Sequence, residues 1–362
     1  MISFYIIAYN EEEIIARCID SFKPCVDEIV VVVDSKTTDR TAEIARGLGA
    51  KVFPFTWIDD FSAMKNFGLD HCNGDWRMYA DADDVLDPDS LQRVRDAVKY
   101  ADANGFNMIT SEYYTMHDAD GKPTANNRVP RLVKAGVSRW RCRIHEYQEC
   151  GLPRQYISNI EIHHKKPVGR AGGTQRNMTM LENALADPTC DEIEKPRYLF
   201  YLAREYMFSA RYQDAVDTFN KYIPISTYPA ERHRAMCDRA DCYSLMGEKN
   251  EAVKSLCEAI DFMPDLPDPY IKMGIIAYNN EDWIMCVKWL RDAAARSENI
   301  HPLFPLASYN SYLPYDYMSV AYHKMGEVEK AYVCELKVYK CLKNDVRIIE
   351  NIKMFEKTLG LT

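Results

Sequence analysis

The sequence lacks the features that would take it to a membrane or to nucleic acid. No apolar run among its 362 residues approaches the ~20 residues that cross a bilayer, and the longest is "IVVVV" at 29–33. The 45 basic residues are fewer than the 54 acidic ones, so no broad basic surface is expected to meet phosphate backbones. The first residues, "MISFYIIAYNEEE", have no basic segment ahead of their apolar part, unlike a secretory signal. We expect a cytoplasmic protein with no membrane span, and the charge argues against nucleic acid as a partner.

The cysteines also lack the spacing of a metal or disulfide framework. All 12 are scattered from Cys18 to Cys341, without any Cys-x-x-Cys pair. We expect reduced, mostly buried thiols, and the same holds for Cys142 and Cys150 in "CRIHEYQEC". A chain of this length that is 47% hydrophobic exceeds one ordinary core, so two domains are expected.

The first hundred residues alternate between apolar strands and amphipathic helices. Strands are predicted at 2–8, 28–34, 51–55 and 75–81, and helices at 11–22, 38–50 and 61–72. The second helix has Thr38 or Asp39 as its cap and ends at Gly47 or Gly49. Strands that are apolar on both faces indicate a parallel sheet covered by helices. The pattern therefore predicts an open, Rossmann-like α/β sheet.

Polar clusters follow three of these strands, at the edge where ligands of open α/β sheets bind. They read "YNEEE" after the first strand, "DSKTTDRT" after the second and "DADD" after the fourth. Asp81, Asp83 and Asp84 would repel one another unless a cation or hydrogen-bond donors keep them ionised. Helix capping is the alternative, but Asp87 or Asp89 is better placed to cap the helix that follows. A metal with an anionic ligand is the preferred interpretation.

Beyond residue 170 the pattern becomes helical and repeats. Four small residues are each followed twelve positions later by another, as in the helix pairs of tetratricopeptide repeats. The pairs are Ala203 and Ala215, Ala240 and Ala252, Gly274 and Cys286, and Ser319 and Ala331. An insertion is expected at "SENIHPLFPLASYNSYLP", whose region carries Tyr309, Tyr312, Tyr315 and Tyr317. These tyrosines either serve a binding surface or pack the linker. We place the α/β domain at 1–172 and the helical repeat domain at 173–362.

Four segments in this order resemble family 2 glycosyltransferases of the GT-A fold. They are "YIIAYNEEEIIARCIDSF", "EIVVVVDSKTTDRTAEIA", "WIDDFSAMKNFGLDHCNGDWRMYADADD" and "RWRCRIHE". Ordered motifs are more specific than a lone Asp-x-Asp, and the likeness covers about the first 180 residues. The "DDFSAMKN" block and the repeats point to the branch with tetratricopeptide repeats, which includes peptide S- and O-glycosyltransferases that modify bacteriocins.

The resemblance implies a nucleotide-sugar site, with a UDP-sugar as donor and Mn²⁺ or Mg²⁺ as cofactor. Asp81 and Asp83 match the Asp-x-Asp pair that holds the metal on the diphosphate, and His164 matches a histidine that approaches it. Ile160 and Ile162 alternate as a strand that ends in His163 and His164, and by this alternation His164 is the better match, with His163 left open. A solvated strand end is the alternative for both histidines. The expected donor contacts are Ala8, Tyr9, Glu11, Asp34, Lys65, Asp81 and Ala82.

Two of these donor contacts keep an alternative. Asp34 matches the aspartate that recognises uracil or ribose, but it could instead only cap the helix begun near Thr38. Lys65 stands where many relatives carry the arginine of "ARN", so a cation is kept but its bidentate fork is lost.

The resemblance also assigns the chemistry. An inverting transfer needs a carboxylate that takes the proton from the acceptor, and Glu146, beside His145, is the first candidate. Asp84 is the second, and an ordinary surface His-Glu pair is the bland alternative. The acceptor is expected to be a peptide or protein side chain, or else a growing or cell-envelope glycan. The repeats are expected to bind the acceptor, to form a homodimer, or both.

Two other classes of function fit the sequence less well. A nucleotidyltransferase would begin with a glycine-rich, basic phosphate loop, which "AYNEEEIIARC" does not provide. A non-catalytic repeat scaffold with a vestigial nucleotide-sugar domain would not need Asp81, Asp83, Glu146 and His164 together. We expect an enzyme, a metal-dependent inverting hexosyltransferase.

Overall fold

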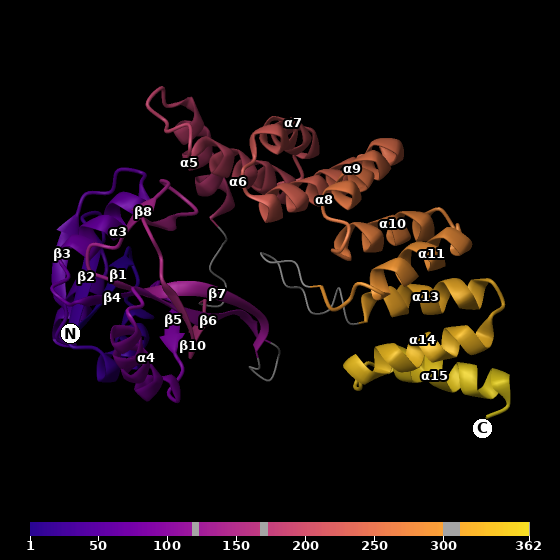
Figure 1. Cartoon of the computed structure of the whole chain (residues 1–362), viewed down its shortest axis with the longest axis horizontal. Coiled ribbons are helices and arrows are strands. Elements are labelled where there is room, and N and C mark those ends of the chain that lie inside the picture. The colour runs from indigo at the N-terminus through magenta and orange to yellow at the C-terminus, as the bar shows by residue number, and fades with distance from the viewer. Residues whose placement is uncertain (118–122, 167–172, 300–311, 362) are drawn as a thin grey trace. The chain divides into compact units, whose positions relative to one another are not determined.

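The computed structural model describes residues 1–117, 123–166, 173–299 and 312–361. These residues form two compact units, Met1–Tyr198 and Leu199–Thr362 (Figure 1). The sequence placed the domain boundary after residue 172, where the chain turns helical. The first compact unit, however, extends to Tyr198 and therefore includes helix α5 (Thr174–Ala186) and the first turn of α6 (Lys195–Phe208).

An eight-stranded mixed sheet, in the order β3-β2-β1-β4-β7-β6-β10-β5, forms the frame of the first unit. Its first half is parallel and consists of the four predicted strands. These are β1 (Ile2–Ala8), β2 (Glu28–Asp34), β3 (Lys51–Phe55) and β4 (Trp76–Tyr79). Every residue of β2 is buried, as expected of a strand covered on both faces.

Helices cover both faces of this half and define two cores. One face of β1 and β2, with Phe4 and Val31, packs against α1 (Ile15–Phe22), α2 (Thr41–Gly47) and α4 (Ser90–Asn104). The opposite face, with Tyr5 and Val32, packs against α3 (Phe61–Asp70). The short 3₁₀ turn η1 (Lys23–Cys25) leads into β2. The alternation of side chains along β1 and β2 builds both layers.

The second half of the sheet is largely antiparallel and was not predicted, apart from its strand β10. Its strands are β5 (Asp84–Leu86), β6 (Met108–His117), β7 (Pro123–Lys134) and β10 (Gln155–His164). β10 runs parallel to β6 and antiparallel to the short edge strand β5. A separate hairpin joins β8 (Ser138–Arg141) to β9 (Tyr147–Cys150).

The second unit consists of helices packed in sequence. After α6 come α7 (Tyr212–Tyr222), η2 (Ile223–Ile225), α8 (Pro229–Leu245), α9 (Lys249–Phe262), α10 (Asp268–Asn279), α11 (Trp283–Ala294), α13 (Leu313–Lys324), α14 (Val328–Cys341) and α15 (Val346–Leu359). The small-residue pairs lie buried between the members of successive helix pairs. Gly274 in α10 shows why size matters, because an added Cβ would lie 2.5 Å from Leu290 Cγ.

The structure bears on the predictions for the insertion, the tyrosines, the cysteines and a membrane span. Most of the predicted insertion, with Tyr309, lies outside the described residues. Tyr315 and Tyr317 pack against the core of the last repeats, which is the packing alternative. All 12 cysteines are free thiols, and most are buried. Among the described residues, no helix combines the length and apolarity that a membrane span requires.

Candidate functional site

The candidate site begins where β1, β2 and β4 end. Ala8 is the last residue of β1, Asp34 the last of β2, and Asp81 follows the end of β4 by two residues. Since β1 lies between β2 and β4 in the sheet, these three ends are neighbours. The sheet order changes direction at β1, which is where open α/β sheets form their ligand crevice.

The loop after β1 is tied to the loop after β2 by hydrogen bonds. Asn10, in the left-handed region with φ of 52°, accepts a bond from the Thr38 backbone N–H at 2.9 Å. The Glu11 backbone N–H donates to Thr41 Oγ1 at 2.7 Å. Tyr9 stands between these bonds and the strand and is 50% exposed. The predicted nucleotide loop is therefore held in place, with one aromatic ring presented to solvent.

Asp34 is buried at the end of β2 and does not cap α2. Its Oδ1 accepts a hydrogen bond from the Lys36 backbone N–H at 3.0 Å. Helix α2 starts at Thr41, whose backbone N–H donates to Asp39 Oδ1 at 2.9 Å. The capping alternative for Asp34 is therefore wrong.

Asp84 is the buried centre of the aspartate cluster. Its side chain is fully buried, and it accepts hydrogen bonds from the Asp81 backbone N–H at 3.0 Å and from Tyr113 Oη at 2.9 Å. Arg131 Nη2 lies 3.2 Å from Asp84 Oδ2, and His164 Nδ1 lies 3.2 Å from Asp84 Oδ1. A carboxylate offers about four lone-pair directions, so these four partners satisfy it.

Asp81 and Asp83 point to different partners. Asp81 accepts a short hydrogen bond from Tyr79 Oη, and its Oδ2 lies 3.9 Å from Arg131 Nη1. Asp83 Oδ1 lies 3.3 Å from His164 Nδ1. The ligand atoms of Asp83, Asp84 and His164 all lie within 4.8 Å of one another, an arrangement that could hold a metal ion. The structure thus brings His164 to the aspartates, with Ala82 buried between Asp81 and Asp83.

The charges around the cluster shift its pKa values in different directions. Burial alone would raise the pKa of Asp81, but the cations Lys65 and Arg131 outweigh it and lower that pKa. Burial raises the pKa of Asp83, and the hydrogen bond to Asp84 raises the pKa of the His164 imidazole. Carboxylate oxygens beside an imidazole make a donor set that fits Mn²⁺ and, through its oxygens, Mg²⁺.

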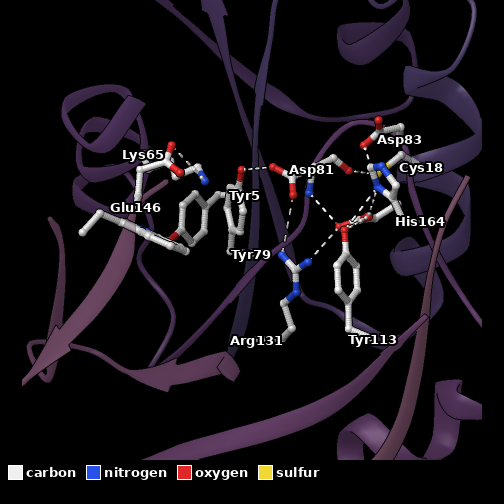
Figure 2. A network of polar contacts seen from close by, with 12 residues as sticks. Tyr5, Cys18, Lys65, Tyr79, Asp81, Asp83, Tyr113, Arg131, Glu146 and His164 are labelled. Atoms are coloured by element: carbon white, nitrogen blue, oxygen red, sulfur yellow. Dashed lines mark hydrogen bonds and ion pairs between the residues drawn. The ribbon is translucent and has the colours of Figure 1, made fainter. Parts of the chain in front are cut away.

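Lys65 and Glu146 form a second pair near the cluster. Lys65 Nζ lies 3.3 Å from Glu146 Oε1, and the two side chains are 8% and 12% exposed. The ammonium also lies 4.5 Å from the ring centroids of Tyr79 and Trp140. Tyr79 therefore stacks with Lys65 through its ring and donates to Asp81 through its hydroxyl (Figure 2). Tyr79 thus connects the Lys65–Glu146 pair to the aspartates, through Lys65 on one side and Asp81 on the other.

The segment that carries Glu146 is irregular and is held by the start of the helical region. His145 has a left-handed φ of 54°, and its carbonyl accepts a bond from Arg197 Nε at 2.7 Å. Two residues earlier, the Arg143 backbone N–H donates to Tyr198 Oη at 2.8 Å. Arg143 also pairs with Asp187. These contacts fix the backbone that presents Glu146.

Sequence reasoning missed Arg131 and Tyr113, which complete the cluster from β7 and β6. Arg131 is 6% exposed and stacks over the Tyr113 ring, with its Cζ 4.3 Å from the centroid. A signal existed, because Arg131 interrupts the apolar stretch "VPRLV" and a buried cation requires a carboxylate partner. Nothing similar distinguishes Tyr113 among the 24 tyrosines.

Two stretches of the chain match known protein families. Residues 3–105 match the family described as Glycosyl transferase family 2, and residues 268–360 match the Prolyl 4-hydroxylase peptide-substrate-binding domain, of the tetratricopeptide type. The chain thus carries a family 2 glycosyltransferase domain of GT-A-like fold followed by a domain of tetratricopeptide-repeat type. The predicted family and fold class are confirmed.

Individual relatives share only part of their length with this chain. The glycosyltransferase SunS of Bacillus subtilis is 26% identical over 231 residues, which cover 60% of this chain and 52% of the relative. An uncharacterized glycosyltransferase of Rickettsia typhi is 42% identical over 99 residues, 27% of this chain and 32% of its own. Among solved structures, the S. aureus protein TarS covers 69% of this chain and 53% of its own, with 13% identity and a TM-score of 0.39.

Proposed function

We propose that this chain is a metal-dependent, inverting glycosyltransferase that moves a hexose from a UDP-sugar to a peptide or protein side chain. The observation that carries the proposal is the convergence of Asp83, Asp84 and His164 beside the strand ends of a family 2 domain. Glycosyltransferase-named relatives support glycosyl transfer as the chemistry. Sugar, metal and acceptor are part of the proposal.

Asp83 and His164 would coordinate the metal, and Asp84 would fix the position of the His164 ring. Asp83 and His164 are 17% and 28% exposed, so their ligand atoms can be reached, whereas the Asp84 side chain is fully buried. Asp81, whose side chain is 42% exposed, would be a further oxygen donor. A bound Mn²⁺ or Mg²⁺ would neutralise the diphosphate that leaves with the nucleotide. Arg131 and Tyr113 fix the positions of the Asp81 and Asp84 carboxylates.

Glu146 is the proposed base, in preference to Asp84. A base must reach the acceptor proton, directly or through one water. Asp84 is fully buried and its oxygens are occupied by four partners, while Glu146 retains some exposure and one close cation. Lys65, with Nζ 3.3 Å from Glu146 Oε1, would fix the orientation of that carboxylate. His145 would position Glu146 through its left-handed backbone rather than take the proton.

The helical unit is proposed to bind the acceptor. Its residues 268–360 match a family described as a peptide-substrate-binding domain, which favours a peptide acceptor over a glycan. A glycan or cell-envelope acceptor is the second candidate. Assembly into a homodimer through the repeats stays a prediction.

Calorimetric titration with UDP in the presence of Mn²⁺ tests the donor site. Asp83→Ala should abolish Mn²⁺-dependent UDP binding, because it removes a ligand, while the melting temperature changes little. Asp89→Asn is the matched control, since Asp89 is exposed and its side chain makes no capping bond. Equal UDP affinity in Asp83→Ala and the native protein would refute the assignment. Failure to hydrolyse any UDP-sugar slowly would instead favour the scaffold alternative.

A further inference from the structure

A second group of metal-ligating side chains lies on the other face of β10. The ligand atoms of Asp87, Glu161 and His163 all lie within 4.8 Å of one another. Glu161 and His163 are two residues apart on β10 and share one face, while His164 points to the opposite face. Asp87 directly follows β5, the strand that carries Asp84. The paired strands β5 and β10 therefore present one group of ligands on each side.

The backbone holds these ligands in fixed register. β5 and β10 pair antiparallel, with His163 opposite Val85, and the Asp87 backbone N–H donates to the Glu161 carbonyl at 3.0 Å. His163 Nε2 lies 3.7 Å from Asp87 Oδ2. Two ligand atoms on a tetrahedral Zn²⁺, each ~2.0 Å from the ion, lie ~3.3 Å apart. Small side-chain rotations would bring this group to that geometry.

The His163 ring also has a polar partner on its second nitrogen. Its Nδ1 lies 2.9 Å from His117 Nε2, and its ring stacks on Tyr114 with centroids 5.1 Å apart. The contact with His117 occupies Nδ1 and leaves Nε2 directed at Asp87. Ligating histidines commonly use their second nitrogen for such an outer hydrogen bond, which fixes the ring.

A competing explanation is that other contacts already satisfy the two carboxylates. Asp87 Oδ1 accepts a hydrogen bond from the Asp89 backbone N–H at 2.9 Å, which leaves Oδ2 on the side of His163. Arg93 Nη1 lies 3.0 Å from Glu161 Oε1, and both side chains are 33% exposed. Partly exposed pairs of this kind contribute little stability, and Arg93 engages only one of the two oxygens. Arg93 also donates to the Asn159 carbonyl at 3.0 Å, so it keeps a partner if Glu161 turns to a metal.

We propose that Asp87, Glu161 and His163 form a second metal site that takes a divalent transition ion of borderline softness, represented by Zn²⁺. One imidazole and two carboxylates favour such an ion over Mg²⁺, which prefers an all-oxygen shell. Water would complete the coordination. The ion would tie the end of β5 to β10, the two strands that carry Asp84 and His164 on their other face. The proposal does not depend on glycosyl transfer.

Calorimetric titration of the full chain with ZnCl₂ in a large excess of Mg²⁺ tests this site. The exposed Cys257 and Cys341 are replaced by Ser in every protein, because free thiols bind Zn²⁺. Every protein also carries His164→Ala, because the aspartate cluster offers the same donor types. In this background we expect one Zn²⁺ per chain, with the affinity reduced at least 100-fold by His163→Ala and by Asp87→Asn. His117→Ala should weaken binding ~10-fold to 100-fold, as loss of an outer hydrogen bond does.

His71→Ala is the control, and it should bind Zn²⁺ like the His164→Ala background. Melting temperature provides a second readout, since Zn²⁺ should raise it in this background but not after Asp87→Asn is added. If the chain bound Zn²⁺ with His164 present but not in the His164→Ala background, the ion would occupy the aspartate cluster and the proposal would be overturned. Unchanged binding in both Asp87→Asn and His163→Ala would overturn it equally.

Discussion

The surroundings of the Asp84 and Glu146 carboxylates differ, and they suit the two residues to different proposed roles. Asp84 is enclosed by Arg131, Tyr113, His164 and a backbone N–H, so its oxygens serve as a fixed centre around which other side chains are arranged. Glu146 has one close cation and lies on an irregular loop. A carboxylate that must exchange a proton with a substrate needs the second environment.

The first prediction at this scale separates the two carboxylates kinetically. Glu146→Gln should lower kcat by ~10²-fold to 10⁴-fold while UDP-sugar affinity stays within a few-fold, because glutamine cannot accept the proton. Steady-state kinetics with titrated UDP provide both values. Asp84→Asn should instead weaken metal-dependent UDP binding and stability together. Normal turnover in Glu146→Gln with kcat lost in Asp84→Asn would reverse the assignment, and retention of anomeric configuration would exclude single displacement altogether.

Local sequence was sufficient for the residues at the strand ends but not for their long-range partners. Asp81 and Asp83 could be placed because they follow the apolar run of β4, and His164 because it alternates with Ile162 on β10. The division between Asp81, directed to Tyr79, and Asp83, directed to His164, depends on side-chain packing that no pattern encodes. Arg131 reaches the cluster through antiparallel pairing of β7, and such pairing leaves only weak signals in one sequence.

At the scale of elements, a buried carboxylate connects the amino-terminal ends of neighbouring strands in the sheet. Glu28 opens β2 and accepts bonds from Ser3 Oγ, from Lys51 Nζ at 2.7 Å and from the Asn73 backbone N–H at 2.8 Å. Gly74 adds to this network, since its N–H donates to Ser3 Oγ at 2.7 Å. This network joins β1, β2, β3 and the turn before β4, at the opposite end of these strands from the candidate site.

Removing this charge should change the pH dependence of stability. Burial opposes ionisation, but Lys51, Ser3 and Asn73 together lower the pKa of Glu28 to about 2 from its ordinary 4.5. Because the folded pKa is the lower one, this stabilisation is present above about pH 4.5 and is lost as the pH falls toward 2. Glu28→Gln should therefore cost roughly 3 kcal/mol at neutral pH and flatten the curve below pH 4.5.

Urea unfolding at several pH values measures this effect, and UDP binding should be unchanged where the variant is folded. Asp20→Asn is the control, because Asp20 is exposed on α1 and should leave the curve as it is. A Glu28→Gln curve parallel to that of the native protein would show that Glu28 does not supply the acid sensitivity.

Close crossing of helices is the corresponding feature of the second unit. Gly274→Ala should destabilise it by ~1–3 kcal/mol, since the new Cβ would lie 2.5 Å from the Cγ of the fully buried Leu290. Gly47→Ala is the matched helical control, because nothing lies within 4 Å of its Cβ position. That change should be neutral or stabilising by up to ~1 kcal/mol. Thermal unfolding measures both.

Leu290→Ala supplies an internal check on the same contact. If the loss in Gly274→Ala comes from the clash, the double variant Gly274→Ala/Leu290→Ala should be more stable than the sum of the two single losses. Additive losses would place the cause elsewhere in α10.

Periodicity explains why some elements were predictable and others were not. Strands β1 to β3 are continuous apolar runs between helices with one apolar stripe, so their bounds came directly from the pattern. β6 and β7 carry polar residues on their outer parts, and β8 and β9 have only four residues each. Long-range pairing stabilises such strands, and one sequence shows it poorly. The small-residue pairs, by contrast, report a steric requirement that each repeat must meet locally.

At the scale of the whole molecule, residues from the start of the helical region hold the segment that carries the candidate base. Asp187, Arg197 and Tyr198 hold Arg143 and His145, next to the candidate base. A domain boundary drawn at residue 172 from sequence would remove all three. The change from strands to helices was visible in the sequence, but these contacts were not, because they depend on where an irregular loop docks.

Two truncated chains test this arrangement together with the role of the repeats. A chain ending at residue 198 should keep slow UDP-sugar hydrolysis, since it retains the aspartate cluster and the contacts that hold Glu146. It should lose transfer to a peptide acceptor if the repeats bind that acceptor. A chain ending at residue 175 should lose most of the hydrolysis as well, because the 142–146 segment is released, while UDP binding with Mn²⁺ falls less. Mass spectrometry of the acceptor and a UDP-release assay measure the two activities. Full transfer by the chain ending at 198 would assign acceptor recognition to the first unit, and equal hydrolysis by both chains would show that Asp187, Arg197 and Tyr198 do not position Glu146.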